Sequence, residues 1–313
     1  MFSRAKQPVA LVRRERPLVV GLIAAGLLLP CLHGCAGQSA GHDERVPPAE
    51  PRNAVDSSAE ATLLLLADGP LTSRPTPADP TPDEAGSEFI LNSQIVPEVS
   101  IQSGLIMQPV HTDAATGYSF SIVTWPESAT LRRHWHPSTE RLWMIEGLIA
   151  SPADGEVGHG KFWEAPARVE MGPFTSTGST FAFLGEGPFE TYYLDEGEQA
   201  PEVGETRTVD PGTMAWKPLA DVAGGLAEGE VKMLSARTQT DRGVYLVRLP
   251  ASTTTREAND GSPYTRFGAN IEGYVLQGEL RYSDPYHGTH LLKPGYYFRI
   301  PAGFPSTVLT ASG

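Results

Sequence analysis

The sequence predicts an all-β fold made of two similar domains that follow each other along the chain. Three observations support this fold class. The 32 glycines and 28 prolines are spread among short apolar runs, such as residues 118–124 and 273–276, which is typical of strands joined by tight turns. No long amphipathic helical pattern is evident. The chain also repeats itself, and its 313 residues are enough for two domains with separate cores.

The first element, residues 1–34, is predicted to be an export signal. Five basic residues precede an apolar stretch from Leu18 to Leu29, in the order of a secretory signal peptide. That stretch is too short to span a bilayer comfortably. It ends in Leu32-His33-Gly34-Cys35, which resembles the bacterial lipobox, although His33 is an unusual occupant. The resemblance implies a lipoprotein anchored through Cys35 on the non-cytoplasmic side of the bacterial cell envelope. A signal peptide cleaved elsewhere and an uncleaved anchor are the alternatives.

The second element, residues 35–93, is predicted to be a disordered tether. From Ala36 to about Gly86 the chain is dense in Pro, Ala, Ser, Asp and Glu, a composition that cannot bury enough apolar surface to fold. The run Thr62–Leu66 interrupts this composition, and Ser57 and Ser58 precede it as candidate helix caps. We expect either a short helix that docks on the folded body or a transient turn.

The folded body is predicted to be two copies of one β unit, at residues 94–205 and 206–313. In the first copy Pro166 lies six positions after Gly160, and in the second Pro301 lies six positions after Gly295. Upstream, apolar runs end in Gly147 and Gly278, and glycine supplies the positive φ that hairpin turns require.

The second copy lacks a counterpart to one strand of the first. The first copy continues into the apolar segment Ser179–Leu184, whereas the second stops at Gly313. A barrel without its last strand would have an unpaired edge. Either the second domain is truncated, which we favour, or another segment such as the N-terminal tether fills the gap.

The residues that carry chemistry lie between positions 124 and 147. His134 and His136 are two apart in a predicted strand, so their side chains point to the same face. Glu140 returns from a short turn onto the neighbouring strand and converges on the same interior point. Two imidazoles and a carboxylate suit a divalent metal such as Fe, Mn, Ni or Zn. A surface histidine pair without metal is the alternative for this spacing taken alone.

This stretch resembles the first cupin motif, except that Ser128 stands where a leading glycine is usual. The second cupin motif usually closes with a Pro-x-Gly turn and a further histidine ligand, and here Pro166, Arg168 and Met171 occupy those positions. Met171 therefore marks the position of a missing fourth ligand. A thioether ligand would favour copper, but we expect Met171 to pack the barrel wall. A cupin that has lost its metal is the alternative.

The second copy is predicted to hold no metal. Aligning Gly278 with Gly147 places no ligand set at the equivalent positions, which are Thr265, Phe267, Ile271 and Ser306. Glu272 lies one residue off register, with Tyr297 and Arg299 near the same wall. A polar organic ligand there and ordinary strand residues remain the two interpretations.

The tandem arrangement resembles bicupins, and more narrowly a bacterial cupin family of unknown function. Residues 162–174 also resemble anti-sigma-factor-type cupins, in which a histidine normally stands at the position of Met171. The resemblance covers residues 94–313 and implies two double-stranded β-helix, or jelly-roll, barrels. Because cupins include dioxygenases, isomerases, sugar-binding proteins and storage proteins, the fold does not decide the reaction.

Two functions are therefore carried forward, and whether the protein is an enzyme stays open. The first is a metal-dependent oxygenase or related oxidoreductase acting on a small organic substrate, with Leu142 and Met144 lining the pocket because they share strand parity with Glu140. The second is a non-catalytic small-molecule-binding or envelope protein. The expected partners are a small molecule, the membrane through the lipid anchor, and a second copy in a homodimer. A net charge of −13 argues against nucleic acid.

Overall fold

The computed structural model describes residues 60–69, 89–101, 104–222, 229–238, 241–250, 265–284 and 288–310. Within these ranges the regular elements are strands and three short 3-10 helices at Ser93–Ile95, Pro211–Thr213 and Leu219–Asp221, so the predicted all-β class is confirmed. None of the helices in these ranges has the length and apolar character needed to cross a membrane. The predicted export signal and Cys35 lie outside the described residues.

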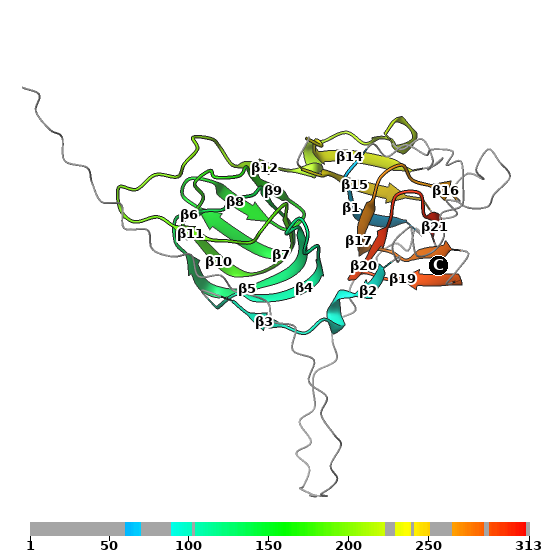
Figure 1. Cartoon of the computed structure of the whole chain (residues 1–313), viewed down its shortest axis with the longest axis horizontal. Helices are drawn as coiled ribbons and strands as arrows, with labels where there is room; N and C mark the ends of the chain where they lie inside the picture. Colours follow the sequence, from blue (N-terminus) through cyan, green and yellow to red (C-terminus); the bar gives the residue numbers. More distant parts are fainter. Residues whose placement is uncertain are drawn as a thin grey trace, which may run out of the picture. The chain divides into compact units, whose positions relative to one another are not determined.

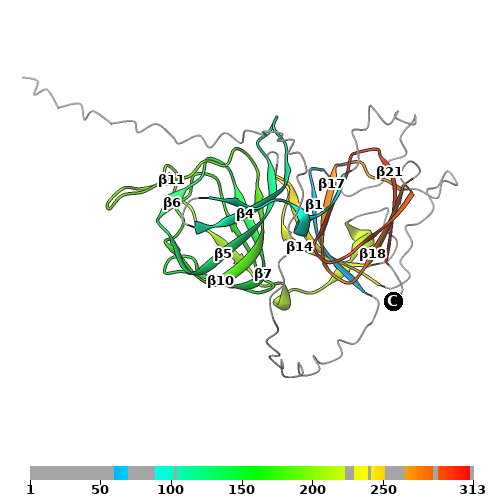
Figure 2. The same cartoon turned by 90° about the horizontal axis from the view of Figure 1, so that it is seen from below.

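The first barrel is built on an antiparallel eight-stranded sheet. Its strand order is β12-β9-β7-β10-β5-β4-β3, and β8 pairs with β7. A second, two-stranded sheet pairs β11 with β6. Figures 1 and 2 show the long strands β4, β5, β7 and β10 curving around the interior of this barrel. The strands are β3 (Val99–Ser100), β4 (Ile106–Thr112), β5 (Ser119–Leu131), β6 (His134–Trp135), β7 (Glu140–Ser151), β8 (Gly155–Gly158), β9 (Phe162–Ala165), β10 (Phe174–Gly185), β11 (Tyr192–Tyr193) and β12 (Arg207–Val209).

The second barrel combines a seven-stranded sheet with a four-stranded one. The strand orders are β13-β14-β15-β1-β17-β20-β2 and β16-β21-β18-β19. Tyr282 of the smaller sheet stacks on Phe298 of the larger, with ring centroids 6.4 Å apart. The strands are β1 (Ala61–Ala67), β2 (Phe89–Asn92), β13 (Lys217–Pro218), β14 (Glu230–Ser235), β15 (Gly243–Leu249), β16 (Thr265–Arg266), β17 (Ile271–Gln277), β18 (Leu280–Asp284), β19 (Gly288–Leu292), β20 (Tyr296–Ile300) and β21 (Pro305–Thr310).

The expected short helix at Thr62–Leu66 is wrong, because this run lies in strand β1, in the middle of the larger sheet of the second barrel. Leu63 and Leu65 pack into the interior of that barrel, whereas Leu64 and Leu66 pack into a second apolar cluster on the other face. A strand buried on both faces is apolar at every position. Such a short run cannot be told from a buried helix by periodicity. Residues 89–92, also predicted as tether, form edge strand β2.

Strand β1 takes the place in the second barrel that β10 takes in the first. β10 lies between β7 and β5, and β1 lies between β17 and β15. The registers agree residue by residue: Gly185 pairs with Glu140, and Ala67 pairs with Ile271. Both ladders also carry a register shift after a threonine, Thr180 in β10 and Thr62 in β1. An N-terminal segment therefore fills the gap that motivated the truncation hypothesis.

Three apolar clusters organise the described chain. One fills the interior of the first barrel, around Met144 and Phe181. A second fills the interior of the second barrel, around Val247 and Phe298. The third contains residues of both barrels, because the outward side chains of β5 and β10 and those of β1 and β15 belong to one cluster. The two barrels are therefore joined by a shared apolar core.

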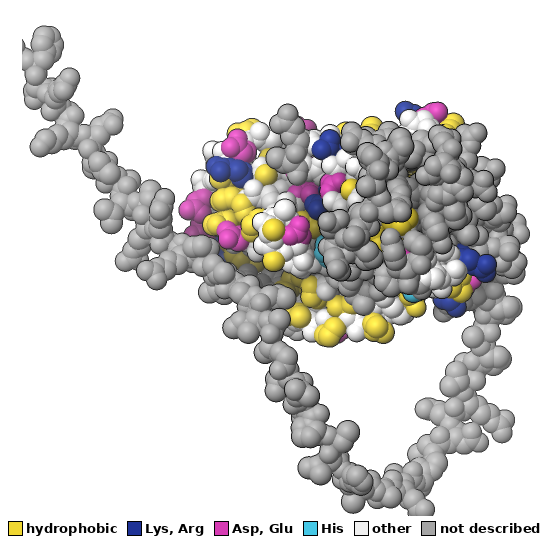
Figure 3. All heavy atoms as spheres, turned by 45° about the vertical axis from the view of Figure 1, so that its right-hand side comes forward, with side chains coloured by type: hydrophobic (Ala, Val, Ile, Leu, Met, Phe, Trp, Pro, Cys, Tyr) yellow, Lys and Arg dark blue, Asp and Glu magenta, His cyan; other side chains and the backbone are white. Residues whose placement is uncertain are grey.

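Among the described residues on the face drawn in Figure 3, no single patch identifies a partner. On the face drawn in Figure 3, apolar, acidic and basic side chains are interspersed over the described residues. The exposed large apolar side chains come from separate elements and are Ile95, Val99, Phe189, Val203, Met233 and Leu291. The homodimer therefore stays a prediction.

Candidate metal centre

His134 and His136 lie on a short, well-anchored segment of the first barrel. Their side chains are only 2% and 3% exposed. His134 pairs with Tyr193 of β11 and exchanges two backbone hydrogen bonds with Met171. The carbonyl of His136 accepts a 2.7 Å hydrogen bond from the backbone N–H of Arg168. The backbone of both predicted ligands is therefore fixed.

Each of the two imidazoles is oriented by a backbone carbonyl. Nδ1 of His134 lies 2.6 Å from the oxygen of Arg132, and Nδ1 of His136 lies 2.7 Å from the oxygen of Glu190. Because a carbonyl can only accept, Nδ1 carries the hydrogen and Nε2 carries the lone pair. The two ring centroids are 4.9 Å apart with planes at 88°. This tautomer, with Nδ1 bonded to a carbonyl, is the one that metal-binding histidines usually adopt.

Glu140 begins β7 and is 6% exposed. Its Oε1 lies 3.1 Å from Nδ1 of His136. Burial raises the pKa of Glu140 well above its usual value. Burial, together with the neighbouring His134, lowers the pKa of His136 to about 3, and burial also lowers the pKa of His134. Both shifts therefore favour the neutral forms of His136 and Glu140 over an ion pair.

The donor chemistry of His134, His136 and Glu140 fits a divalent metal, but the three side chains are not grouped around one point. No set of three or more His, Cys, Asp or Glu side chains in the described ranges is arranged to hold a metal ion. The Glu140 carboxyl lies beside Nδ1 of His136, the ring nitrogen that also bonds to the carbonyl of Glu190. Two Nε2 lone pairs and a buried carboxyl with no described Lys or Arg partner nevertheless match a two-histidine, one-carboxylate metal site.

Met171, Leu142 and Met144 all lie in the interior cluster of the first barrel. Met171 is 2% exposed and sits opposite His134 in the backbone bridge, which is where the resemblance placed the missing ligand. Leu142 and Met144 are 5% and 0% exposed and lie on the same side of β7 as Glu140. Their predicted place on the inner wall agrees with this packing, while their contact with a ligand stays a prediction.

The segment between β10 and β11 covers His136, and no sequence pattern predicted this contact. The Phe189 ring stacks on His136 at 5.4 Å between centroids and also meets Phe183 edge-on. The carbonyl of the next residue, Glu190, is the acceptor for His136 Nδ1. Phe189 is 47% exposed, so it stands between the buried imidazole and solvent. A lone phenylalanine in a turn carries no pattern that would predict this role.

Three buried hydrogen-bonding groups of the first barrel have no partner among the described residues: Ser121 Oγ, Trp125 Nε1 and Trp163 Nε1. Both indoles contact Phe174, which also contacts His134. An indole N–H can only donate, and a buried donor without an acceptor is costly. The surroundings of the histidines therefore include donors that an oxygen-bearing ligand or a water could satisfy.

The predicted equivalences in the second barrel are confirmed by the ladder geometry. Thr265 pairs with Ser306 as His134 pairs with Met171. The carbonyl of Phe267 accepts from Gly303 N–H as the carbonyl of His136 does from Arg168.

The interpretation of Glu272 and Tyr297 as the wall of a ligand site in the second barrel is wrong. The side chains of Glu272 and Tyr297 leave the interior and meet Tyr118 of the first barrel in a buried cluster. They lie on the outer face of the sheet because they differ by one residue from the inward positions.

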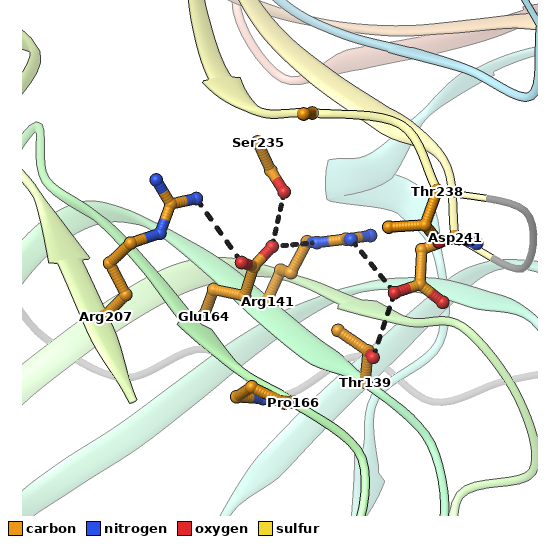
Figure 4. A pocket seen from close by; sticks show the side chains of 9 residues that line it. Thr139, Arg141, Glu164, Pro166, Arg207, Ser235, Thr238 and Asp241 are labelled. Carbon is orange, nitrogen blue, oxygen red and sulfur yellow. Dashed lines mark hydrogen bonds and ion pairs between the residues drawn. The ribbon is translucent and has the colours of Figure 1, made fainter. Parts of the chain in front are cut away.

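A polar pocket of about 390 Å³ opens on the outer face of β7, at the junction of the barrels. Figure 4 shows that its charged side chains bond to one another. Arg141 lines this pocket, and its side chain points away from the barrel interior because it alternates with Glu140 along the strand. The pocket is thus separate from the histidine site, and the interior site is the better candidate for chemistry.

Comparison with known proteins agrees with this architecture. Residues 87–190 match the family described as the ChrR cupin-like domain, so this segment is a cupin-like domain. No curated protein sequence matches the chain.

Among solved structures, a provisionally named dioxygenase of Nostoc punctiforme is similar with a TM-score of 0.59 and 15% identity, covering 72% of this chain and 80% of that one. A provisionally named glyoxylate-induced protein of Pseudomonas aeruginosa is similar with a TM-score of 0.50 and 14% identity, covering 71% and 84%. At such identities the likeness concerns the fold. The described chain thus has a fold like that of tandem cupin barrels.

Proposed function

We propose that the protein binds one divalent metal ion through His134, His136 and Glu140 and uses it to transform a small organic substrate, as a metal-dependent oxygenase or related oxidoreductase. The observation that carries the proposal is the pair of buried histidines whose Nδ1 hydrogens are held by carbonyls. Such bonds leave the Nε2 lone pair of each ring available to a metal. The buried carboxyl of Glu140 beside them has no other described charged neighbour.

The protein's own contribution to binding is to present two neutral imidazoles, because burial lowers the pKa of both histidines. Burial raises the pKa of Glu140 and so favours the protonated form of this carboxyl in the metal-free protein. Because a metal binds the carboxylate, metal binding is expected to release a proton from Glu140. When bound, the ion supplies Lewis-acid or redox chemistry at ligand positions that the protein leaves open.

The surroundings favour a substrate with an apolar body and acceptor oxygens. The interior cluster that contains Leu142, Met144 and Met171 would contact the apolar part. The indole N–H groups of Trp125 and Trp163 have no described acceptor and would donate to a carbonyl or carboxylate oxygen. The name of the Nostoc punctiforme protein makes oxygen-dependent reactions the first class to screen.

The place of action is proposed from the sequence. The basic segment, the short apolar stretch and the cysteine at position 35 follow the order of a lipoprotein signal. We infer that the mature protein is held on the non-cytoplasmic side of the bacterial cell envelope by a lipid on Cys35. Metabolic labelling with a fatty acid tests this, and a Cys35→Ala variant that still carries the label contradicts it.

The direct test of the metal site is elemental analysis of purified protein beside a His134→Ala/His136→Ala variant. About one Fe, Mn, Ni, Zn or Cu per chain in the parent and none in the variant is expected. Calorimetry of metal binding in buffers with different ionisation enthalpies should show release of one proton. A parent that takes up no metal even after reconstitution contradicts the proposal.

A second function is favoured by Met171 and by the incomplete grouping of the three side chains. In this alternative the first barrel binds a small molecule without turning it over. Ligand-dependent protection against thermal unfolding, without consumption of oxygen or ligand, would support it. Loss of turnover in a folded His136→Ala variant would instead support the enzyme.

A further inference from the structure

The two residues that flank Glu140 reach out of the first barrel and contact the second. Thr139 Oγ1 donates a 3.1 Å hydrogen bond to Oδ2 of Asp241. Nη2 of Arg141 lies 3.5 Å from the same Oδ2. Figure 4 shows both side chains converging on the Asp241 carboxylate. One carboxylate of the second barrel therefore holds the chain on both sides of the predicted metal ligand.

Asp241 is itself held by Thr238, which also lies between β14 and β15. Its backbone N–H donates to Thr238 Oγ1 at 2.9 Å, and its carbonyl accepts from Thr238 N–H at 3.1 Å. The side chain of Asp241 is 17% exposed. The acceptor is thus held by the fold of the second barrel and does not depend on a flexible side chain alone.

A carboxylate of the first barrel, that of Glu186, makes further contacts at the same junction between the barrels. Glu186 forms ion pairs with Arg141 and, at 3.0 Å, with Arg242 of the second barrel. Its backbone N–H donates a 3.0 Å hydrogen bond to the carbonyl of Thr139. Nε of Arg141 also donates to Glu164 at 2.6 Å. Arg141 is 1% exposed, so this buried network has few alternative arrangements.

We propose that Asp241 of the second barrel is a positioning residue for the metal site of the first barrel, acting through Thr139 and Arg141 on the backbone of Glu140. The inference rests on the proposed metal site. It explains how a barrel without a ligand set contributes to the site of its neighbour. A metal ligand must be held within about 0.5 Å of its productive position. Glu140 is the first residue of its strand, so strand pairing anchors the chain only on the C-terminal side of this residue.

The test compares the metal affinity of four single variants and one double variant in the full-length protein, with Mn²⁺, Fe²⁺ and Zn²⁺ as probes. Asp241→Ala removes the acceptor. Thr139→Val removes the donor and keeps the shape, whereas Thr139→Ser keeps the donor. Glu272→Gln is the matched control, because this interface carboxylate bonds to the hydroxyls of Tyr118 and Tyr297 and not to the residues beside Glu140.

Asp241→Ala and Thr139→Val are each expected to weaken metal binding about tenfold, the lower end of the loss typical for residues that support metal ligands. The double variant Asp241→Ala/Thr139→Val should lose little more than Asp241→Ala alone, because Asp241→Ala already removes the hydrogen bond that Thr139→Val removes. Thr139→Ser should bind like the parent. Glu272→Gln should keep the metal affinity even where its urea midpoint falls as far as that of Asp241→Ala.

Parental affinity in Asp241→Ala would overturn the inference while leaving the metal site standing. An equal loss in Glu272→Gln would also overturn it, because the interface as a whole would then be responsible. If the parent protein binds none of the three ions, the metal site itself fails, and that result is distinct from both.

Discussion

The two barrels share a ladder register but differ in what the inward positions carry. Glu140 pairs with Ala165 at the start of β7, and Ile271 pairs with Ile300 at the start of β17. The first barrel places a buried carboxyl there, with its pKa raised by burial, and the second places an isoleucine in an apolar cluster. The same barrel scaffold can therefore hold either a candidate site or an apolar core at these positions. The choice depends on a few residues at equivalent positions.

The outward positions next to these differ in charge and not in burial. Arg141 follows Glu140 and pairs with Glu164 across the ladder, whereas Glu272 follows Ile271 and faces Arg299. Arg141 and Glu272 are 1% and 2% exposed, and each reaches the other barrel. Opposite charges at equivalent positions allow the two sheets to join without bringing like charges together.

The largest expected effect comes from removing β1. A chain that begins after Gly69 loses the strand between β15 and β17 of the second barrel. With its central pairing and four buried leucines gone, the second barrel should lose cooperative unfolding and protease resistance. Urea titration followed by tryptophan fluorescence and limited proteolysis measures this. An unchanged unfolding transition would mean that β1 does not contribute to the stability of the second barrel, although it occupies the position of β10.

Substitutions at the equivalent positions Glu140 and Ile271 should change stability in opposite directions. Ile271→Glu places a carboxyl without a cation in an apolar core and should destabilise by about 4 kcal/mol. Glu140→Leu removes such a group and should stabilise by about 1 kcal/mol, while abolishing metal binding. Urea unfolding of the metal-free proteins measures both. Destabilisation by Glu140→Leu would contradict the view that Glu140 is kept for function.

The histidine pair should make the first barrel sensitive to acid. The folded pKa of His136 is lowered to about 3, so its contribution is present above the unfolded value near 6.5 and is lost as pH falls toward 3. His136→Phe copies Phe267 of the second barrel. It should reduce the pH slope of metal-free stability between pH 6 and 4 by about 1.4 kcal/mol per unit. Unfolding at several pH values tests this, and equal slopes in parent and variant would refute it.

The smallest effect concerns a backbone position. Arg168 has φ of 66° and Gly303, at the equivalent position, has φ of 78°. A side chain in this region costs about 1 kcal/mol. Arg168→Gly should therefore stabilise by roughly that amount, and Gly303→Ala should destabilise by a similar amount. Thermal unfolding resolves both changes. If Arg168→Gly instead weakens metal binding, the strained arginine belongs to the site.

Local sequence was sufficient where one pattern has one structural solution. The spacing from His134 to Glu140 placed three side chains on the inside of one barrel, because strand parity is a property of the backbone. Gly147 and Gly278 were correctly paired because both turns need a positive φ, which is 77° in each. The same alignment made Ile271 the counterpart of Glu140 in the second copy.

Local sequence failed where distant segments meet. Nothing in Thr62–Leu66 shows that partners more than 170 residues away lie on both sides of it, and those partners decide between strand and helix. Phe189 and Glu190 likewise contact His136 because the segment between β10 and β11 passes over this histidine.

The sequence by itself determined the all-β class, the repeat and the inward residues, since these follow from local geometry, and it predicted the ligand types from donor chemistry. Only the tertiary structure decided that β1 completes the second barrel and that Glu272 faces the first. It alone also showed that Asp241 touches both neighbours of Glu140. Such contacts depend on where strands far apart in the chain come together, and pairing of that kind leaves no mark in a local pattern.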